Sequence, residues 1–374
     1  MRIAFASDSA YPWFNGGIEK RRYIIMRKLA EEGHEVHCFT MHRKNMPGHV
    51  FTYKGIRYHS VGEALGWEGM YRGGSKRRSI RMPLIFSAQL FWKILPYRFD
   101  AVDADNFPFL HLFPLFFYSK IRGARFAITW HEVWSAGFWK RYLSGLGILG
   151  YFVEWISARM ADVHIANSST TKRLLISELG ADPDKIIVFP VAVDTEEMRR
   201  YSRIRYRKKD QFLVASRLVG HKRVELAISA IAKTKAKLLV IGTGPDEEKL
   251  VRLASEVAPG QVTFKHSLPT EQHYRSFLES RALIMPSARE GLSLVTVEAL
   301  ALGVPVVVAN TSSLPEEVKS MCLETGEDRL GSMLNKILAN SKRYENRAMG
   351  LREKVLREFS GDDAGKVYEQ VVES

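Results

Sequence analysis

The stretch RALIMPSAREGLSLVTVEALALGVPVVVA, residues 281–309, decides the fold. Its first apolar run ends at Pro286, and a polar loop follows. From Ser293 the apolar residues recur at helical spacing. Ser293 suits the position before a helix and Gly303 the position after one. Residues 304–309 are a β-branched run, typical of a strand that is buried on both faces. The stretch therefore predicts a strand, a helix and a second strand, which is a βαβ unit of a parallel sheet.

The polar loop between the strand and the helix carries the candidate chemistry. In open α/β sheets, ligands bind outside the carboxyl ends of the strands, and Glu290 and Gly291 lie at that edge. The amide groups at the start of the helix after Ser293 suit an anion such as a diphosphate. Glu298 lies about one and a half turns into the helix, where it could hydrogen-bond a diol such as a ribose. The alternative is that both glutamates are ordinary solvated surface acids.

The same stretch resembles a known signature. The frame PSxxEGxxLxxxEAxAxGxPVV, which begins at Pro286, resembles that of the GT4-type retaining glycosyltransferases (glycosyl transferases group 1), which have the GT-B fold. The resemblance implies that Glu290 contacts the donor sugar and that Glu298 contacts the nucleotide ribose. The residues between them, at the start of the helix, are further candidate donor contacts: Gly291, Leu292, Ser293, Leu294 and Val295. One difference is visible, because the family usually has a second glycine in this loop.

Two motifs in the first half extend the resemblance. The pattern PxxxGGIE contains Gly16 and Gly17, is followed by GHEV at residues 33–36, and resembles the amino-terminal motif of the same family. The resemblance implies that this glycine loop meets the donor diphosphate and the reacting sugar. A predicted strand at 124–130 ends at His131, and the family usually has a histidine there, close to the donor sugar. His131 is therefore a candidate catalytic residue, although a lone histidine is more often structural.

Two turns of the second half carry further candidates. The pattern RLxxxK places Arg217 and Lys222 at a predicted strand-to-helix turn and resembles the Arg/Lys pair of the family. The resemblance implies that these two cations neutralise the diphosphate and stabilise it as a leaving group. The turn at 242–244 resembles the family's turn near the nucleotide base, which makes Gly244 a candidate donor contact.

Strand and helix patterns alternate in both halves of the 374-residue chain. Together with the resemblance, this alternation predicts an α/β protein of GT-B architecture, in which two Rossmann-like domains face each other across a cleft. The predicted divisions are an acceptor-side domain at 1–194, a linker at 195–209, a nucleotide-sugar-binding domain at 210–355 and a C-terminal helix at 356–374 that crosses back to the first domain.

The net charge of +14 favours anionic partners such as nucleotides, nucleic acid or an anionic membrane surface. A basic loop at 70–82 lies next to an aromatic-rich tract at 86–118, a combination typical of enzymes that bind a membrane surface. Another basic run, 199–209, is typical of a solvated linker or helix face, and no nucleic-acid-binding motif is recognised. Contact with a membrane surface is therefore one hypothesis, and no nucleic-acid partner is expected.

The cysteine content and the apolar runs indicate the cellular compartment in which we expect the protein. Cys38 and Cys322 are the two cysteines, and they lie in different predicted halves, so a disulfide framework is not expected. No apolar run reaches the roughly 18 residues of a membrane-spanning helix, and the N-terminus lacks a signal-peptide pattern. We expect a protein of the reducing cytoplasm, either free there or peripheral on the cytosolic face of a membrane.

The resemblance implies a retaining glycosyltransferase that moves a sugar from a nucleotide-diphosphate sugar to a lipid-linked, glycan or small-molecule acceptor. No Asp-x-Asp pair is placed to hold a diphosphate through a metal, so we expect no metal site and no cofactor besides the donor substrate. Two alternatives remain open. A sugar-nucleotide hydrolase or epimerase on the same fold would consume the donor without an acceptor. A basic, non-enzymatic nucleic-acid-binding protein would bind oligonucleotides with a steep salt dependence.

Overall fold

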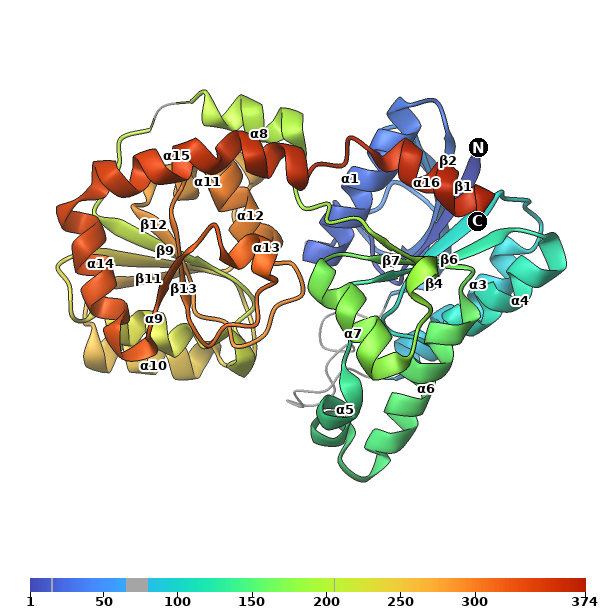
Figure 1. Cartoon of the computed structure of the whole chain (residues 1–374), viewed down its shortest axis with the longest axis horizontal. Coiled ribbons are helices and arrows are strands. Elements are labelled where there is room, and N and C mark those ends of the chain that lie inside the picture. Colours follow the sequence, from blue (N-terminus) through green and yellow to red (C-terminus); the bar gives the residue numbers. More distant parts are fainter. Residues whose placement is uncertain (15, 65–79, 205) are drawn as a thin grey trace. The chain divides into compact units, whose positions relative to one another are not determined.

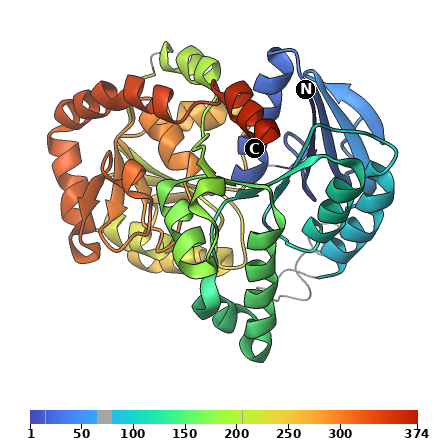
Figure 2. The same ribbon diagram turned by 45° about the vertical axis from the view of Figure 1, so that its right-hand side comes forward.

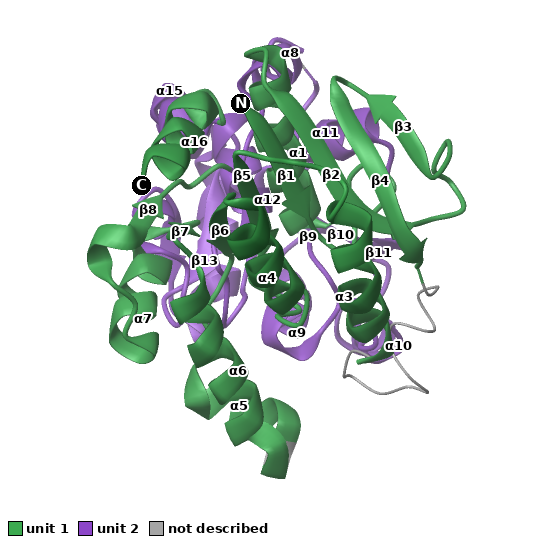
Figure 3. Cartoon of the chain, turned by 90° about the vertical axis from the view of Figure 1, so that its right-hand side faces the viewer, with its two compact units in different colours: residues 1–191, 361–374 green, residues 192–360 purple. Residues whose placement is uncertain are grey.

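The computed structural model describes residues 1–374 except 15, 65–79 and 205 (Figure 1). The chain divides into two compact units, coloured separately in Figure 3. Unit 1 comprises residues 1–191 and 361–374, and unit 2 comprises residues 192–360. Each unit holds its own sheet with helices on both faces, so the α/β fold class predicted from the sequence is confirmed. The basic loop predicted at 70–82 lies largely outside the described residues.

The sheet of unit 1 has eight strands in the order β3-β4-β2-β1-β5-β6-β7-β8. All neighbours pair in parallel except β3 and β4, which are antiparallel. The strands are β1 (Arg2–Ala6), β2 (Glu35–His42), β3 (Val50–Tyr53), β4 (Ile56–Glu63), β5 (Ala101–Asp105), β6 (Arg125–Trp130), β7 (Val163–Ala166) and β8 (Ile186–Val188).

Helices cover both faces of this sheet, because successive strand residues point to opposite sides and both sides are apolar. In β1, Ala4 and Ala6 join one core cluster, whereas Ile3 and Phe5 join the other. The helices are α1 (Gly17–Glu31), α3 (Arg81–Ile94), α4 (Leu112–Arg122), α5 (Ser135–Leu143), α6 (Gly147–Met160), α7 (Ser169–Leu179) and α16 (Ala364–Glu373), with short 3-10 turns η2 (Ser144–Leu146) and η3 (Pro183–Lys185).

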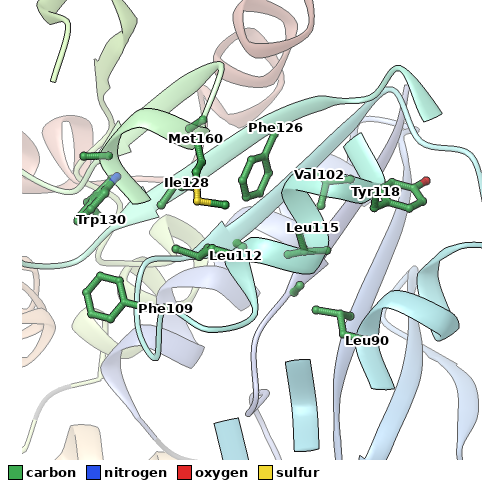
Figure 4. Packing of buried hydrophobic residues seen from close by; sticks show 14 of the residues in the cluster. Leu90, Val102, Phe109, Leu112, Leu115, Tyr118, Phe126, Ile128, Trp130 and Met160 are labelled. Atoms are coloured by element: carbon green, nitrogen blue, oxygen red, sulfur yellow. The ribbon is translucent and has the colours of Figure 1, made fainter. Parts of the chain in front are cut away.

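The aromatic-rich tract of the first half is largely core. Leu112 and Leu115 of α4 point toward Phe126 and Ile128 of β6 (Figure 4). Helices α1 and α16 pack against the opposite face, where Tyr368 of α16 is fully buried. The C-terminal helix therefore belongs to unit 1 although the segment just before it, which ends at Ser360, belongs to unit 2.

The sheet of unit 2 has six strands, all parallel, in the order β11-β10-β9-β12-β13-β14. Its strands are β9 (Gln211–Ala215), β10 (Lys237–Ile241), β11 (Val262–Lys265), β12 (Ala282–Met285), β13 (Val306–Ala309) and β14 (Leu323–Thr325). Its helices are α8 (Thr195–Ser202), α9 (Val224–Ile231), α10 (Glu247–Val257), α11 (Thr270–Glu279), α12 (Leu294–Ala301), α13 (Glu316–Lys319), α14 (Leu330–Ala339) and α15 (Ser341–Glu358), with 3-10 turns η4 (Gly220–Lys222) and η5 (Glu327–Arg329).

The segment 195–209, predicted as a linker, begins with a packed helix. Helix α8 buries Met198 and Tyr201 in one core cluster of unit 2. Near the end of the segment, the Lys208 ammonium donates to the Ser280 carbonyl at 2.8 Å. Burial lowers the pKa of Lys208 to about 8.

The βαβ unit predicted within 281–309 is confirmed, as β12, α12 and β13. Gly303 has φ +74°, and its amide donates to the Leu300 carbonyl, as expected of a glycine that ends a helix. Ser293 precedes α12 as predicted, but it does not cap the helix with its side chain. Its φ is +61°, and its hydroxyl pairs with that of Thr296 at 2.8 Å. The left-handed backbone favours glycine, and this is the loop in which the family usually has a second one.

Two glycines after β10 let two loops of unit 2 pack directly on each other. A Cβ on Gly244 would lie 2.3 Å from the Leu218 carbonyl oxygen, and one on Gly242 would lie 1.9 Å from that of Ser216. The same loops exchange hydrogen bonds, with the Leu218 amide donating to Thr243 at 2.9 Å. The loops after β9 and β10 are therefore held at a spacing that only glycine permits.

Replacing Gly244 with alanine should destabilise unit 2 by about 1–3 kcal/mol, because the clashing atoms are backbone and cannot move aside. Gly220→Ala is the matched control, since the nearest atom to its added Cβ is the Asp246 carboxylate at 3.7 Å. Urea unfolding followed by far-ultraviolet circular dichroism measures both. Equal stabilities of the two variants would show that the close approach is not a constraint.

A buried histidine makes unit 1 sensitive to acid. His164 lies on β7, and its Nδ1 accepts a hydrogen bond from the Trp130 indole at 3.0 Å. Burial lowers the pKa of His164 to about 4, against about 6.5 in an unfolded chain. The unfolded state therefore binds this proton more readily, so the stabilisation is full above pH 6.5 and is lost as the pH falls toward 4.

Between pH 6.5 and pH 4, His164 should lower the free energy of unfolding by about 3 kcal/mol. His164→Asn, which keeps an acceptor for the indole, should flatten the pH dependence of the free energy of unfolding by that amount. All seven tryptophans lie in unit 1, so indole fluorescence during urea unfolding reports this unit alone. His49→Asn, at an exposed histidine of the same unit, is the control. An unchanged pH dependence in His164→Asn would contradict the assignment.

Candidate functional site

The strand order of unit 2 reverses between β9 and β12. The chain runs from β9 outward through β10 to β11, and then returns to the other side of β9 to build β12, β13 and β14. At such a switch point the two neighbouring loops leave the sheet in opposite directions and open a crevice at the carboxyl edge. The loop after β9 contains Arg217 and Lys222, and the loop after β12 contains Glu290 and Gly291. Residues that lie far apart in the sequence therefore meet at the place where α/β sheets bind ligands.

Within these loops the structure brings Lys222 and Glu290 together. The Lys222 ammonium donates to the Glu290 carboxylate at 2.6 Å, and their side chains are only 13% and 9% exposed. The Ala288 amide also donates to the His221 carbonyl, which joins the two loops through the backbone. Arg217 is exposed at the same edge. The hypothesis that Glu290 is an ordinary solvated acid is therefore wrong.

Arg223, which the sequence analysis did not single out, fixes the relative positions of three loops. Its guanidinium donates to the Pro286 carbonyl after β12 at 2.8 Å, to the Thr311 hydroxyl after β13 at 3.0 Å, and to the Glu327 carboxylate. Its φ is +49°, which is uncommon outside glycine. In the sequence Arg223 is just one more cation beside Lys222, because its partners become neighbours only in the folded sheet.

Helix α12 starts at this edge, and the other residues predicted to contact a donor lie in the loop before it and in its first turn. Leu292 and Ser293 are buried, whereas Gly291, Leu294 and Val295 are half-buried. The first amides of a helix have no partner within the helix and are available to an anion. Gly244 lies in the loop after β10, where its packing on Leu218 gives it a structural role.

Glu298 is also not a solvated acid, because its side chain is only 6% exposed. The Tyr274 hydroxyl lies 3.5 Å from its Oε1 and donates to Glu197 at 2.8 Å. The His273 imidazole lies 3.7 Å from Oε2. Glu298 therefore lies beneath the edge of the sheet, on the side of α12 that faces α11.

The sheet of unit 1 has its own switch point, between β1 and β5. The glycine loop follows β1, and Gly16 immediately precedes α1, of which Gly17 is the first residue. Glu19 reaches back toward this helix start and accepts a hydrogen bond from the Ser9 hydroxyl at 2.6 Å. Burial raises the pKa of Glu19. The glycine pair therefore borders a turn whose polar side chains are already paired.

His131 follows β6, beside this switch point, and its ring is held by a buried ion pair. Its Nε2 lies 2.7 Å from the Asp105 carboxylate at the end of β5, and Arg22 of α1 forms an ion pair with the same carboxylate. Burial alone would raise the pKa of Asp105, but Arg22 and His131 together hold it at about 2. Burial lowers the pKa of His131 more than Asp105 raises it, so the imidazole is neutral at neutral pH.

The backbone on either side of His131 is fixed as well. Its amide donates to the Asn106 side chain at 3.2 Å, and its carbonyl accepts from the Asn167 side chain at 2.9 Å. Asn106 in turn donates to the Glu132 carbonyl. Both asparagines directly follow strands that neighbour β6, so the sheet itself sets the direction of the histidine.

No metal site was predicted, and the described residues contain one group of side chains with metal-ligand chemistry. His42, His49 and Glu63 place one candidate ligand atom each within 4.8 Å of one another, at the edge formed by β2, β3 and β4. The two imidazoles stack, with ring centroids 4.3 Å apart and 30° between their planes. Nitrogen lone pairs lie in the ring planes, so stacked rings do not both point at one ion. The group is packed as a surface cluster rather than as a formed metal site.

Two family models match consecutive parts of the chain. The model described as Glycosyltransferase Family 4 matches residues 15–197, and the one described as Glycosyl transferases group 1 matches residues 195–348. Among curated proteins, the D-inositol 3-phosphate glycosyltransferases of Mycobacterium bovis and Mycobacterium tuberculosis are 33% identical to the chain over 176 residues. That match covers 42% of this chain and 36% of the relative, so the chain spans about a third of the length of these relatives.

Solved structures resemble the chain over nearly its whole length. Sucrose-phosphate synthase from Thermosynechococcus elongatus has a TM-score of 0.79 at 18% identity, covering 99% of this chain and 98% of that one. HepE of Anabaena, in complex with UDP, has a TM-score of 0.73 at 16% identity and full coverage of both chains. WaaG, a glycosyltransferase involved in lipopolysaccharide biosynthesis, has a TM-score of 0.72 at 16% identity, covering 99% of each chain. The fold is GT-B, and the chain belongs to the GT4 family of glycosyltransferases, the glycosyl transferases group 1.

Proposed function

We propose that the protein transfers a sugar from a nucleotide-diphosphate sugar to a lipid-linked or glycan acceptor, with retention of configuration at the anomeric carbon. The observation that carries the proposal is the gathering of Arg217, Lys222, Glu290 and the start of α12 at the switch point of unit 2. Membership of the family supports the reaction type. The names of the relatives support a sugar donor, since HepE has been solved with UDP and with UDP-glucose.

In this proposal the cations of unit 2 bind the diphosphate. Lys222 and Arg217 neutralise the phosphate oxygens, and the amides at the start of α12 donate to them. Glu290 neutralises Lys222 in the structure at 2.6 Å, so an arriving diphosphate competes with a carboxylate for the same ammonium. Glu290 then becomes available to the hydroxyl groups of the donor sugar. Glu298 accepts from the ribose hydroxyls.

In unit 1, His131 contacts the donor sugar. Its neutral imidazole, held through Nε2 by Asp105, exchanges a hydrogen bond with a sugar hydroxyl rather than supplying a charge. The reaction breaks the bond between the anomeric carbon and the leaving phosphate oxygen. It forms a bond from the acceptor oxygen on the same face, and the departing phosphate takes the acceptor proton. The fixed cations stabilise the charge on that phosphate, which is the role a metal ion plays in other enzymes of this chemistry.

Binding of UDP, GDP and ADP by isothermal titration calorimetry tests the diphosphate site without knowledge of the acceptor. Arg217→Ala and Lys222→Ala should each weaken the binding of the preferred diphosphate by about ten- to a hundredfold, because each removes a charge-assisted hydrogen bond. Arg252→Ala, at an exposed arginine of α10, should leave the affinity unchanged. Wild-type affinity in both site variants would show that the diphosphate does not bind at this edge of the sheet.

Glu290→Gln separates binding from turnover. The amide keeps the shape of the carboxylate but no longer neutralises Lys222, so the dissociation constant for the diphosphate should stay the same or fall. Consumption of UDP-glucose in the presence of a membrane extract as acceptor source should fall by about a hundredfold or more, as for other groups that contact the reacting centre. Glu248→Gln, on the exposed side of α10, is the control. Weaker diphosphate binding with normal turnover would contradict both assigned roles. Donor consumption that is independent of any acceptor would favour the hydrolase alternative.

A further inference from the structure

Helices α5 and α6 form a hairpin that projects from unit 1. The two helices pack along each other and are joined by η2 at the tip (Figure 1). In all three whole-chain views the hairpin extends beyond the sheet and the other helices of unit 1 (Figures 1, 2 and 3). The apolar pattern of residues 137–160 predicts a packed helix pair, and this pair is observed as α5 and α6.

The inner face of the hairpin is rigidly built. A Cβ on Gly147 would lie 2.6 Å from the Lys140 backbone, and one on Gly150 would lie 2.1 Å from the Trp139 ring. Glu154 of α6 is fully buried and accepts from the Trp134 amide and the Trp139 indole, both at 2.7 Å. These contacts join α6 closely to α5 and to the segment before it.

The outer face of the hairpin is apolar and exposed. Leu146, Ile148, Leu149 and Phe152 are 61%, 76%, 57% and 53% exposed. A helix that is apolar around most of its circumference is normally buried on all sides. Among the residues that the structure describes, those that pack on α6 leave its outer side exposed, so this side is an apolar face of the kind that marks an interaction surface.

The exposed charges of the hairpin are all positive. The charged residues between 135 and 160 are Lys140, Arg141, Arg159 and Glu154, and the glutamate is buried inside the hairpin. Lys140 and Arg141 are exposed in the last turn of α5, close to the tip. The surface that surrounds the apolar face therefore complements an anionic partner. A second copy of the hairpin would bring like charges together.

We propose that the tip of the α5–α6 hairpin, with Leu146, Ile148, Leu149 and Phe152, inserts into the headgroup region of an anionic lipid membrane, where Lys140 and Arg141 contact the lipid phosphates. Apolar side chains beside lysine and arginine are the combination by which proteins bind the surface of a bilayer without crossing it. None of the described helices is long and apolar enough to cross a membrane. The hairpin is a different place from the basic loop at 70–82 and the tract at 86–118, and the inference does not depend on the proposed reaction.

Co-sedimentation of the purified full-length chain with lipid vesicles tests the proposal. The wild type should bind vesicles that mix phosphatidylcholine with phosphatidylglycerol, and bind phosphatidylcholine alone much more weakly. The triple variant Ile148→Gln, Leu149→Gln, Phe152→Gln should bind the mixed vesicles more than about tenfold more weakly, because it removes the apolar contact. Val251→Gln, Val257→Gln is the matched control, since these exposed apolar residues lie on α10 of unit 2.

A second variant tests whether Lys140 and Arg141 contact the anionic lipid. Thermal melts and the oligomeric state serve as further measurements. Lys140→Gln, Arg141→Gln should abolish the preference for phosphatidylglycerol while leaving weak binding to phosphatidylcholine. Circular dichroism melts of all variants should match the wild type, because the replaced side chains are exposed. Failure of the wild type to bind mixed vesicles, or equal binding by the triple variant and the wild type, would overturn the proposal. A wild-type dimer that the triple variant converts to a monomer would assign the face to a second copy instead.

Discussion

Two buried aspartates at the end of β5 are the constraint on which unit 1 depends. Asp103 and Asp105 point to the same face of the strand and are both shielded from water. A buried carboxylate destabilises the fold unless it is paired and hydrogen-bonded. Asp105 is paired with Arg22 of α1 and with His131 after β6, and Asp103 accepts from Thr129 of β6 and from Tyr368 of α16. Two helices and the central strands are therefore fixed to one another by two carboxylates.

The same contacts affect the carboxyl edge of the sheet, where the candidate site residues of unit 1 lie. Arg22 joins α1 to Asp105, and the same helix begins at the glycine pair, so this ion pair holds the element that carries the glycines. Asp105 also holds Nε2 of the buried His131 ring, which leaves Nδ1 as the ring nitrogen that Asp105 does not engage. In unit 2, Arg223 plays a comparable part by joining the loops after β12 and β13 to η4. In both units, the candidate site residues at the carboxyl edge of the sheet are held in place by polar contacts between residues that are distant in the sequence.

The sequence predicted the elements better than the contacts that position them. Residues 281–309 have an apolar pattern strong enough to predict strand, helix and strand, and the predicted order is observed. Asp103 and Asp105 could not be recognised, because an acidic pair on a strand gains its partners only through the order β1-β5-β6. Arg223 was missed for the same reason. The burial of Glu290 and Glu298 also depends on neighbours that are distant in the sequence. The roles of the predicted site residues in binding a donor stay predictions.

The chain passes from unit 1 into unit 2 and returns to unit 1. Unit 2 is one continuous segment, 192–360, while unit 1 is completed by the residues on either side of it. Its two ends lie together, since the Ala192 amide donates to the Phe359 carbonyl and Val193 pairs with Ser360. In unit 1, a Cβ on Gly361 would lie 3.6 Å from the Val191 side chain. In the order of the chain, unit 2 is thus an insertion within unit 1, and the two ends of unit 2 adjoin. A gene in which a short glycine linker replaces 192–360 would still supply Tyr368 to Asp103, whereas simple truncation after unit 2 would remove α16 and leave that carboxylate without its hydroxyl donor.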